Sequence, residues 1–348
     1  MIRTLVAEDS LTTRELLVAV LRSDPQVDVV GEAANGVEAL EMTRKLRPDV
    51  VTMDIRMPLL DGFEATRQIM VEAPTPIVIV SASIDVRDVE VSMHALRAGA
   101  LALLPTPSGP GSPAFEEQAK HFLETVKLMS QVKVVRRWPR HRASASAPSP
   151  VPAGARPQVV AVGASTGGPA ALARIISELP GDFPVPLLAV QHIARGFMDG
   201  FAAWLNAAGA LKVKIGEDGE PLQPRTVYLA PDDAHLGVSP DRVSITVSRA
   251  ASVGGFRPSA SYLFASVARA FGPSAVAVIL TGMGNDGIEG LRAVHAGGGR
   301  VLAQDEETSV VFGMPGAAAA AGVVDVVLPL GAIAFRLLEL VGRGGPHA

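Results

Sequence analysis

The sequence predicts two α/β domains joined by a linker. Short apolar runs alternate with amphipathic segments from residue 2 to about residue 130 and again from residue 158 onward, and the stretch between the two series has a different composition. Alternating strand and helix patterns are typical of parallel sheets with helices on both faces. A chain of 348 residues is also long enough for two such domains.

The first series predicts a domain over residues 1–127. Its five strand-like runs read RTLVA, VDVVGEA, DVVTM, PIVIVSA and ALALL. The remaining segments have apolar residues three and four positions apart, which is the spacing of a helix face. These segments read TTRELLVAVLRSD, GVEALEMTRKLR, GFEATRQIMVEA, VRDVEVSMHALRAG and AFEEQAKHFLETVKLMSQV.

The linker is predicted at residues 128–157. Its first part is basic, and its second part, ASASAPSPVPAGARP, is rich in Ala, Ser and Pro without any period. Such a composition buries too little apolar surface to fold by itself. The basic residues are interpreted as a solvated helix end, with a patch for a partner or a nucleic acid as the alternative.

The second series predicts a doubly wound, mostly parallel α/β domain over residues 158–348. Its strand-like runs each end in a polar or glycine-rich loop and read VVAVGAS, VPLLAVQHI, TVYLAPD, SAVAVILTG and RVLAQD. From residue 156 onward acidic residues slightly outnumber basic ones and no basic recognition helix is evident, so a DNA-binding domain is not expected.

Composition excludes several other classes of site. The chain has no cysteine, which removes disulfides, zinc–thiolate centres and cysteine nucleophiles. Its net charge of −4 argues against binding of nucleic acid over the whole surface. It begins without a signal-peptide pattern and has no uninterrupted apolar run of about 18 residues. We therefore expect a cytoplasmic protein that does not insert into membranes.

Acidic residues gather where strands of the first domain end. Glu8 and Asp9 follow the first strand, Asp54 the third, and Ser81 ends the fourth. Because ligands of open parallel sheets bind beyond the carboxyl ends of the strands, these side chains are expected to converge there. Clustered carboxylates repel one another unless a cation is present, and oxygen ligands suit Mg²⁺. One acid can then act as a nucleophile toward phosphate.

With its MDIRMPLLDG block and the ALRAGA approach to the fifth strand, the first domain resembles the receiver domain of bacterial response regulators. The resemblance implies a flavodoxin-like fold and phosphorylation of Asp54 by a histidine kinase. It also implies that Glu8, Asp9, Asp54 and the backbone carbonyl of Arg56 hold Mg²⁺, and that Ser81 senses the phosphoryl group.

One position departs from the receiver pattern. Where that family has a lysine before a proline, this chain reads LLPTPSG and has Thr106. A lysine can pair with a phosphoryl group as a charge, whereas threonine can only form a hydrogen bond. We therefore expect phosphorylation to couple weakly to the output, or the domain to act without it.

The second domain begins with the turn GASTGG between a strand and a helix-like stretch. Gly163-x-Ser165-x-Gly167 fits a nucleophile elbow, which exposes a serine hydroxyl at a strand end. A loop that binds an anion at a helix N-terminus and a plain tight turn both remain as alternatives. In this turn Ser165 stands where a GxGxxG motif has its second glycine, and no P-loop lysine follows, which favours the nucleophile.

A serine nucleophile needs a base and an acid that orients the base. His192 follows a strand directly, so it is expected at the same sheet edge as Ser165. Asp286 lies in a glycine-rich loop after another strand and is the candidate acid. His235, in APDDAHLGV, is a competing base, whereas His295 and His347 are interpreted as ordinary surface or tail residues.

The second domain is similar to the catalytic domain of the CheB family of chemotaxis protein-glutamate methylesterases. The similarity rests on blocks that read VGASTGGPAAL, QHI, GFMDGFAAWLN, VYLAPDDAHLGV, FRPSASYLFASVA, LTGMGNDGIEGL and AQDEETSVVFGMP. It implies that Ser165 is the nucleophile, His192 the general base and acid, and Asp286 the residue that orients His192. The backbone N–H groups of Thr166 and Met283 become candidates for the oxyanion hole.

The resemblance also implies a reaction and its partners. The expected activity is hydrolysis of glutamyl γ-methyl esters on methyl-accepting chemotaxis receptors, with possible deamidation of receptor glutamines and no cofactor for the esterase. Because one linker joins the two domains, we also expect the receiver to restrain the esterase. The chain departs from the family in HIARGF, which lacks the usual proline, and at Ser261, where an aspartate is common. The alternatives are a receiver-linked esterase of a non-motility pathway under weak or phosphorylation-independent control, and a non-catalytic scaffold.

Overall fold

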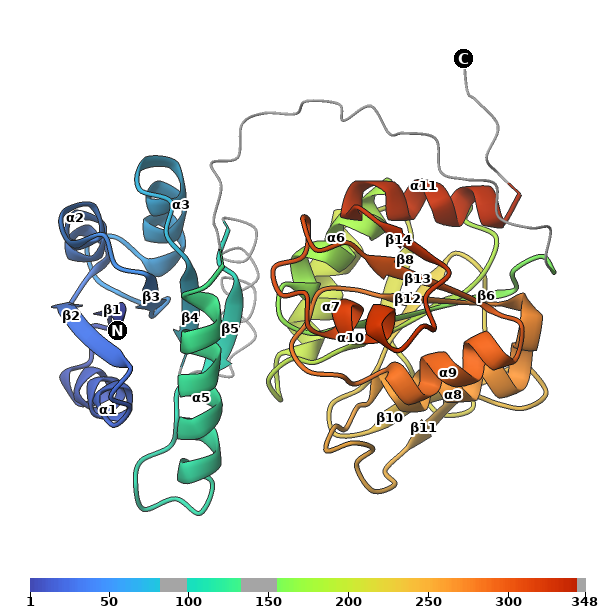
Figure 1. The fold of residues 1–348 in the computed structure, drawn as a ribbon, viewed down its shortest axis with the longest axis horizontal. Coiled ribbons are helices and arrows are strands. Elements are labelled where there is room, and N and C mark those ends of the chain that lie inside the picture. The colour runs from blue at the N-terminus through green and yellow to red at the C-terminus, as the bar shows by residue number, and fades with distance from the viewer. Residues whose placement is uncertain (82–98, 133–154, 343–348) are drawn as a thin grey trace. The chain divides into compact units, whose positions relative to one another are not determined.

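The computed structural model describes residues 1–81, 99–132 and 155–342. The chain divides into two compact units, Met1–Arg142 and Ala143–Ala348, each with its own sheet (Figure 1). The helix predicted to follow the fourth strand lies, except for its last residue, outside the described ranges. Among the helices within these ranges, none has the length and apolar character that crossing a bilayer requires.

The first unit is a five-stranded parallel sheet in the order β2-β1-β3-β4-β5, which is the flavodoxin-like order that the resemblance implied. Its elements are β1 (Ile2–Ala7), α1 (Leu11–Arg22), β2 (Val27–Ala33), α2 (Gly36–Leu46), β3 (Val50–Met53), α3 (Gly62–Glu72), β4 (Ile77–Ser81), β5 (Ala102–Pro105) and α5 (Phe115–Met129). Strands β3 and β4 are buried along their whole length, because helices cover both faces of the sheet.

Short polar residues start the first three helices of this unit. The side chains of Ser10, Asn35 and Asp61 accept hydrogen bonds from backbone N–H groups in the first turns of α1, α2 and α3. The last helix, α5, continues to Met129, beyond the domain boundary expected at residue 127. It does so because its buried face continues to Met129.

The second unit is a seven-stranded parallel sheet in the order β14-β13-β12-β6-β7-β9-β8. Its elements are β6 (Val159–Ala164), α6 (Gly168–Glu178), β7 (Leu187–Gln191), α7 (Met198–Ala208), β8 (Lys212–Ile215), β9 (Thr226–Leu229), β10 (His235–Val238), β11 (Ile245–Ser248), α8 (Ala260–Phe271), the 3₁₀ turn η1 (Gly272–Ser274), β12 (Ala275–Ile279), α9 (Ile288–Ala296), β13 (Arg300–Gln304), α10 (Met314–Ala320), β14 (Val326–Leu328) and α11 (Leu330–Leu340).

Four strands of this unit were not expected from the sequence. The edge strands β8 and β14 have four and three residues, and β10 and β11 form a separate antiparallel hairpin of four residues each. Length alone does not explain this, since β9 also has four residues and was expected. Strands β8, β11 and β14 each bury only one residue, so they lack the buried run that is typical of an interior strand. The five strands that were expected form the interior of the sheet.

Helix α8 packs closely over the centre of the sheet because glycines face it. A Cβ atom at Gly163 would lie 2.9 Å from Cβ of Ala260 and 3.0 Å from the ring of Phe264. A Cβ atom at Gly290, on α9, would lie 2.6 Å from Cβ of Phe264. The wholly buried Phe264 ring therefore fills the space that these glycines leave, and it supports the loops described below.

Replacement of Phe264 by Ala is expected to lower the free energy of unfolding of the second unit by about 3–5 kcal/mol, because it opens a cavity in a closely packed core. The matched control is Phe335→Ala on α11, where the side chain is 54% exposed, with an expected change within about 0.5 kcal/mol. Urea denaturation followed by the fluorescence of Trp204, with Trp138 replaced by Phe throughout, measures both. Equal effects of the two substitutions would contradict this packing.

Candidate active site

Three neighbouring strands at the centre of the second sheet end at one rim. Strand β6 lies between β12 and β7, and Gly163 is level with Ile279 on one side while Ala164 is level with Gln191 on the other. The chain passes from β6 to β7 on one side and reaches β12 on the other, so the rim is a topological switch point. Ser165 follows β6, His192 follows β7, and Asp286 lies in the loop after β12.

The two candidate groups His192 and Asp286 are in direct contact. Nε2 of His192 lies 3.0 Å from Oδ2 of Asp286, whose side chain is 2% exposed. The carboxylate also accepts hydrogen bonds from the Ser259 hydroxyl at 2.8 Å and from the backbone N–H groups of Ala260, Ser261 and Gly287 at 2.7, 3.0 and 2.8 Å. Two of these backbone donors belong to the first turn of α8, where the helix dipole favours a negative charge.

These contacts keep Asp286 ionised. Burial alone raises the pKa of a carboxyl group, but the hydrogen bond and charge of His192 and the backbone donors outweigh it and lower the pKa of Asp286 to about 2. An ionised carboxylate can only accept, so the proton in the His192–Asp286 hydrogen bond is assigned to Nε2. At neutral pH, Asp286 therefore holds His192 in one tautomer.

In that tautomer the lone pair of His192 lies on Nδ1. This atom is buried and has no hydrogen-bond partner among the described residues. A buried acceptor left unsatisfied costs on the order of 1–3 kcal/mol, so such atoms in native structures call for an explanation. Nδ1 is thus the imidazole atom that is free to accept a proton, the reverse of the arrangement in chymotrypsin-like triads.

Ser165 is tied to the same rim through its backbone. Its N–H donates to the carbonyl of Thr281 at 3.1 Å, and its own carbonyl accepts a hydrogen bond of 2.8 Å from Nε2 of Gln191. The same amide nitrogen donates to the carbonyl of His192 at 2.8 Å. Gln191 therefore links the serine loop to the histidine loop. Sequence reasoning missed this role, although an amide at the end of an otherwise apolar strand was a usable signal.

The two backbone N–H groups predicted for an oxyanion hole, those of Thr166 and Met283, donate to no atom of the described residues. The loops that carry Thr166 and Met283 contact each other closely. The Thr281 hydroxyl donates to the Thr166 carbonyl at 2.9 Å, and a Cβ atom at Gly282 would lie 2.7 Å from Cβ of Ser165. The close approach of these loops requires glycine at position 282.

His235, the competing candidate base, uses both ring nitrogens in other hydrogen bonds. It is wholly buried, its Nε2 lies 3.1 Å from the carbonyl of Ala251, and its Nδ1 accepts from the N–H of Ser259 at 3.2 Å. Neither nitrogen is left to take a serine proton. His235 instead holds Ser259, the residue whose hydroxyl donates to Asp286. Sequence reasoning did not single out Ser259, although its place as N-cap of α8 was recognisable.

The two departures in the second domain lie next to this network. Ser261 accepts a hydrogen bond of 2.8 Å from the N–H of Gly287, beside Asp286. In the HIARGF segment, the N–H of Gly196 donates to Asp232 at 2.7 Å. A hydrogen bond thus fixes the backbone near each of the two departures. Of the other histidines, His295 lies 3.6 Å from Asp325 on the surface, and His347 lies outside the described residues.

A second cluster lies at the rim of the first sheet. Carboxylate oxygens of Glu8, Asp9 and Asp54 lie within 4.8 Å of one another. Burial, the charges of Asp54 and Asp9 and the Asp9 hydrogen bond raise the pKa of Glu8 to about 7, against the lowering effect of a hydrogen bond from Ser10. Burial and Asp9 likewise raise the pKa of Asp54 to about 6, although backbone N–H groups of Ile55 and Arg56 oppose the shift. Crowded oxygen donors with raised pKa values fit a site for Mg²⁺.

Ser81 ends β4, which pairs with β3, and Thr106 follows the next strand, β5. The N–H of Thr106 donates to the carbonyl of Ser81 at 3.0 Å. The Thr106 hydroxyl is buried and has no hydrogen-bond partner in the described part of the chain. This hydroxyl is uncharged and can still form a hydrogen bond. Arg56 donates its backbone N–H to Asp54 at 3.1 Å.

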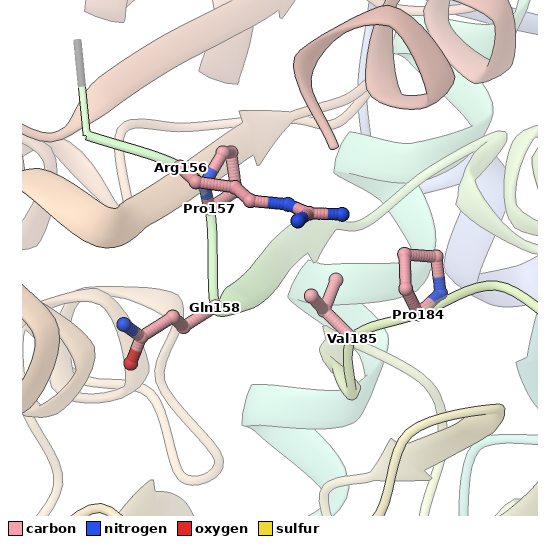
Figure 2. A pocket seen from close by; sticks show the side chains of 5 residues that line it. All are labelled: Arg156, Pro157, Gln158, Pro184 and Val185. Atoms are coloured by element: carbon pink, nitrogen blue, oxygen red, sulfur yellow. The ribbon is translucent and has the colours of Figure 1, made fainter. Parts of the chain in front are cut away.

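A separate hollow lies on the opposite edge of the second sheet. Figure 2 shows it between Arg156, Pro157 and Gln158, just before β6, and Pro184 and Val185, just before β7. It therefore opens at the amino ends of the strands, away from Ser165 and His192. Ligands of parallel sheets bind at the carboxyl ends, so this hollow is not part of the candidate active site.

Comparison with known families agrees with the division of the chain. The CheB methylesterase family matches residues 160–337, and the response regulator receiver domain matches residues 4–111. The chain is also similar to the catalytic domain of the CheB methylesterase of Thermotoga maritima, with 41% identity and a TM-score of 0.52 over 54% of this chain and 100% of that one.

Relatives of known name extend the similarity to the whole chain. A Myxococcus xanthus protein named protein-glutamate methylesterase/protein-glutamine glutaminase 4 is 58% identical over 99% of this chain and 98% of its own. An Anaeromyxobacter dehalogenans protein of the same name, numbered 3, is 56% identical over 97% of this chain and 98% of its own. The chain belongs to the CheB methylesterase family and carries a response regulator receiver domain.

Proposed function

We propose that this chain hydrolyses glutamyl γ-methyl esters of methyl-accepting chemotaxis receptors and deamidates receptor glutamines, with Ser165, His192 and Asp286 as its catalytic residues. The observation that carries the proposal is the His192–Asp286 pair, whose Nδ1 atom on His192 has no hydrogen-bond partner among the described residues and lies at the rim where Ser165 follows β6. The printed names of the relatives support the choice of substrate.

In the proposed reaction, Nδ1 of His192 takes the proton of the Ser165 hydroxyl as its oxygen attacks the ester carbonyl. The N–H groups of Thr166 and Met283 are the proposed donors to the tetrahedral oxyanion, where one such donor is worth roughly 3–4 kcal/mol. Collapse returns the proton from Nδ1 to the leaving methoxide, and methanol departs. Water then attacks the acyl-enzyme by the same route and leaves a glutamate. With glutamine as the substrate, ammonia leaves instead.

Asp286 does not take up a proton in this scheme. Its depressed pKa keeps it charged throughout the neutral range. When His192 becomes an imidazolium, the adjacent carboxylate stabilises the positive charge and retains the ring orientation. Folding has already provided the donors that keep this carboxylate ionised, so they need not reorganise during the reaction.

We further propose that residues 1–127 form the regulatory receiver domain, that 128–157 link it to the catalytic domain at 158–348, and that Asp54 is phosphorylated by a histidine kinase. Mg²⁺ held by Glu8, Asp9, Asp54 and the Arg56 carbonyl would neutralise the charges of the carboxylates and the incoming phosphoryl group. Ser81 is the proposed sensor of the phosphoryl group. Thr106 offers it a hydrogen bond in place of the charge of a lysine.

Replacement of Ser165 by Ala is expected to reduce methanol release from methylated receptor membranes by roughly 10⁴–10⁶-fold, because the nucleophile is lost. The matched control is Ser177→Ala on α6, an exposed serine whose hydroxyl donates only to the Arg174 carbonyl, and it should retain wild-type rates. Methanol release that is the same in both variants would rule out the proposed nucleophile.

Replacement of Ser259 by Ala removes one of the donors to Asp286 and the N-cap of α8. A hydrogen bond to a charged group is worth about 1.5–3 kcal/mol, so kcat/KM should fall roughly 10- to 100-fold. Ser10→Ala removes the cap of α1 and controls for the stability lost with a cap, about 1 kcal/mol, without touching the second unit. An unchanged kcat/KM for Ser259→Ala would contradict its role in holding Asp286.

The affinity of the full chain for Mg²⁺ is expected to rise between about pH 5.5 and pH 8. Both Glu8 and Asp54 have raised pKa values, about 7 and about 6, so protons compete with the ion as the pH falls. Calorimetric titration with Mg²⁺ measures this. In Asp54→Asn, affinity should fall and the midpoint of the pH dependence should move down, because a charge that raises the pKa of Glu8 is gone.

The Asp54→Asn variant also tests whether Asp54 is the phosphoryl acceptor. Labelling from a small-molecule phosphodonor with Mg²⁺ should appear in the wild type and be absent in Asp54→Asn. A wild-type affinity for Mg²⁺ that does not vary with pH would count against the cluster, and equal labelling of both chains would exclude Asp54 as the acceptor.

A further inference from the structure

The ring of Phe256 lies parallel on the imidazole of His192. The ring centroids are 4.5 Å apart and the planes differ by 4°. Phe256 is only partly buried and does not belong to the packed core of the unit. Phe256 is the first residue of the FRPSASYLFASVA block, but nothing in the sequence predicted this contact, because the residue lies in a loop before α8, far along the chain from His192.

The stack supplies a restraint that the hydrogen bond to Asp286 does not. That bond holds one atom of the ring, Nε2, in place. The lone pair on Nδ1 lies in the plane of the ring, so its direction depends on how the plane is tilted. A flat aromatic surface against one face of the imidazole limits this tilt. The π face also favours the positive charge that the ring carries after it takes a proton.

The loop holds Phe256 firmly in this place. Val253 and Phe256 exchange two backbone hydrogen bonds of 3.0 and 3.1 Å, and Gly254 and Gly255 between them have φ values of +61° and +88°. Two residues with positive φ form the tight turn that suits a β-hairpin, and glycine adopts it without strain. The next residue, Arg257, is anchored to Asp233 at 2.8 and 2.6 Å.

We propose that Phe256 is a positioning residue that aligns the His192 imidazole for proton transfer. The proposal rests on the proposed esterase function. It assigns to Phe256 a role in the rate of the chemical step and none in holding the substrate. Its loss should therefore lower kcat and leave KM nearly unchanged.

The test uses the full chain with Phe256→Leu, which removes the flat ring but keeps an apolar side chain. Phe256→Tyr is the conservative variant, and Phe335→Leu, the same substitution at an exposed residue of α11, is the matched control. Methanol release from methylated receptor membranes gives kcat and KM. Relaxation of ¹³C-labelled histidine rings measures the mobility of the His192 imidazole without any turnover, with its signal identified by its loss in His192→Asn.

For Phe256→Leu we expect kcat to fall roughly three- to tenfold, KM to stay within about twofold and the His192 ring to become more mobile. Phe256→Tyr and Phe335→Leu should match the wild type in all three. If Phe256→Leu does not fold, Phe256→Met is measured in its place.

Unchanged kcat and ring mobility would overturn the proposal. A rise in KM alone would also overturn it, because Phe256 would then be a substrate contact. If the wild type releases no methanol, the esterase function fails, and ring mobility decides by itself whether Phe256 positions His192.

Discussion

The candidate active site depends on a buried negative charge. Asp286 is almost completely removed from water, and an isolated carboxylate there would take up a proton. Four hydrogen-bond donors besides His192 prevent this, and all four come from the start of α8 and from the residue after Asp286. The packing of α8 against the glycines of β6 and α9 brings these donors to the rim. Fold and electrostatics are therefore coupled at this one residue.

Each unit has an aspartate at its sheet rim, and the pKa values of the two are shifted in opposite directions. In each, an aspartate follows a strand of a parallel sheet. Asp286 is surrounded by donors, and its pKa falls to about 2. Asp54 lies near Glu8 and Asp9, and burial together with Asp9 raises its pKa to about 6. The first environment retains a charge that orients the His192 ring, whereas the second suits a metal ion and a phosphoryl group. The neighbouring backbone N–H groups and side chains, and not the strand-end position, decide between these outcomes.

The glycine turn before α6 shows how two interpretations of one motif are related. A phosphate loop and a nucleophile elbow both use glycines and free N–H groups at a helix start. Here Gly167 is the N-cap of α6 with a φ of +78°, and the loop from β12 approaches so closely that position 282 must be glycine. The neighbouring His192–Asp286 pair favours the nucleophile. The free N–H groups then suit a transient oxyanion in place of a bound phosphate.

The sequence by itself determined the two α/β units, the central strands and the residues that end them, because strand periodicity and glycine turns are local features. It also placed Ser165, His192 and Asp286 on one sheet edge, since parallel strands share an edge. Short strands such as β14 and β8 were missed. Only the tertiary structure decided which ring nitrogen meets Asp286, that His235 holds Ser259, that Gln191 joins two loops and that Phe256 covers His192. Those contacts join residues distant in the chain, and their geometry is set by how helices and loops pack, which no local pattern encodes.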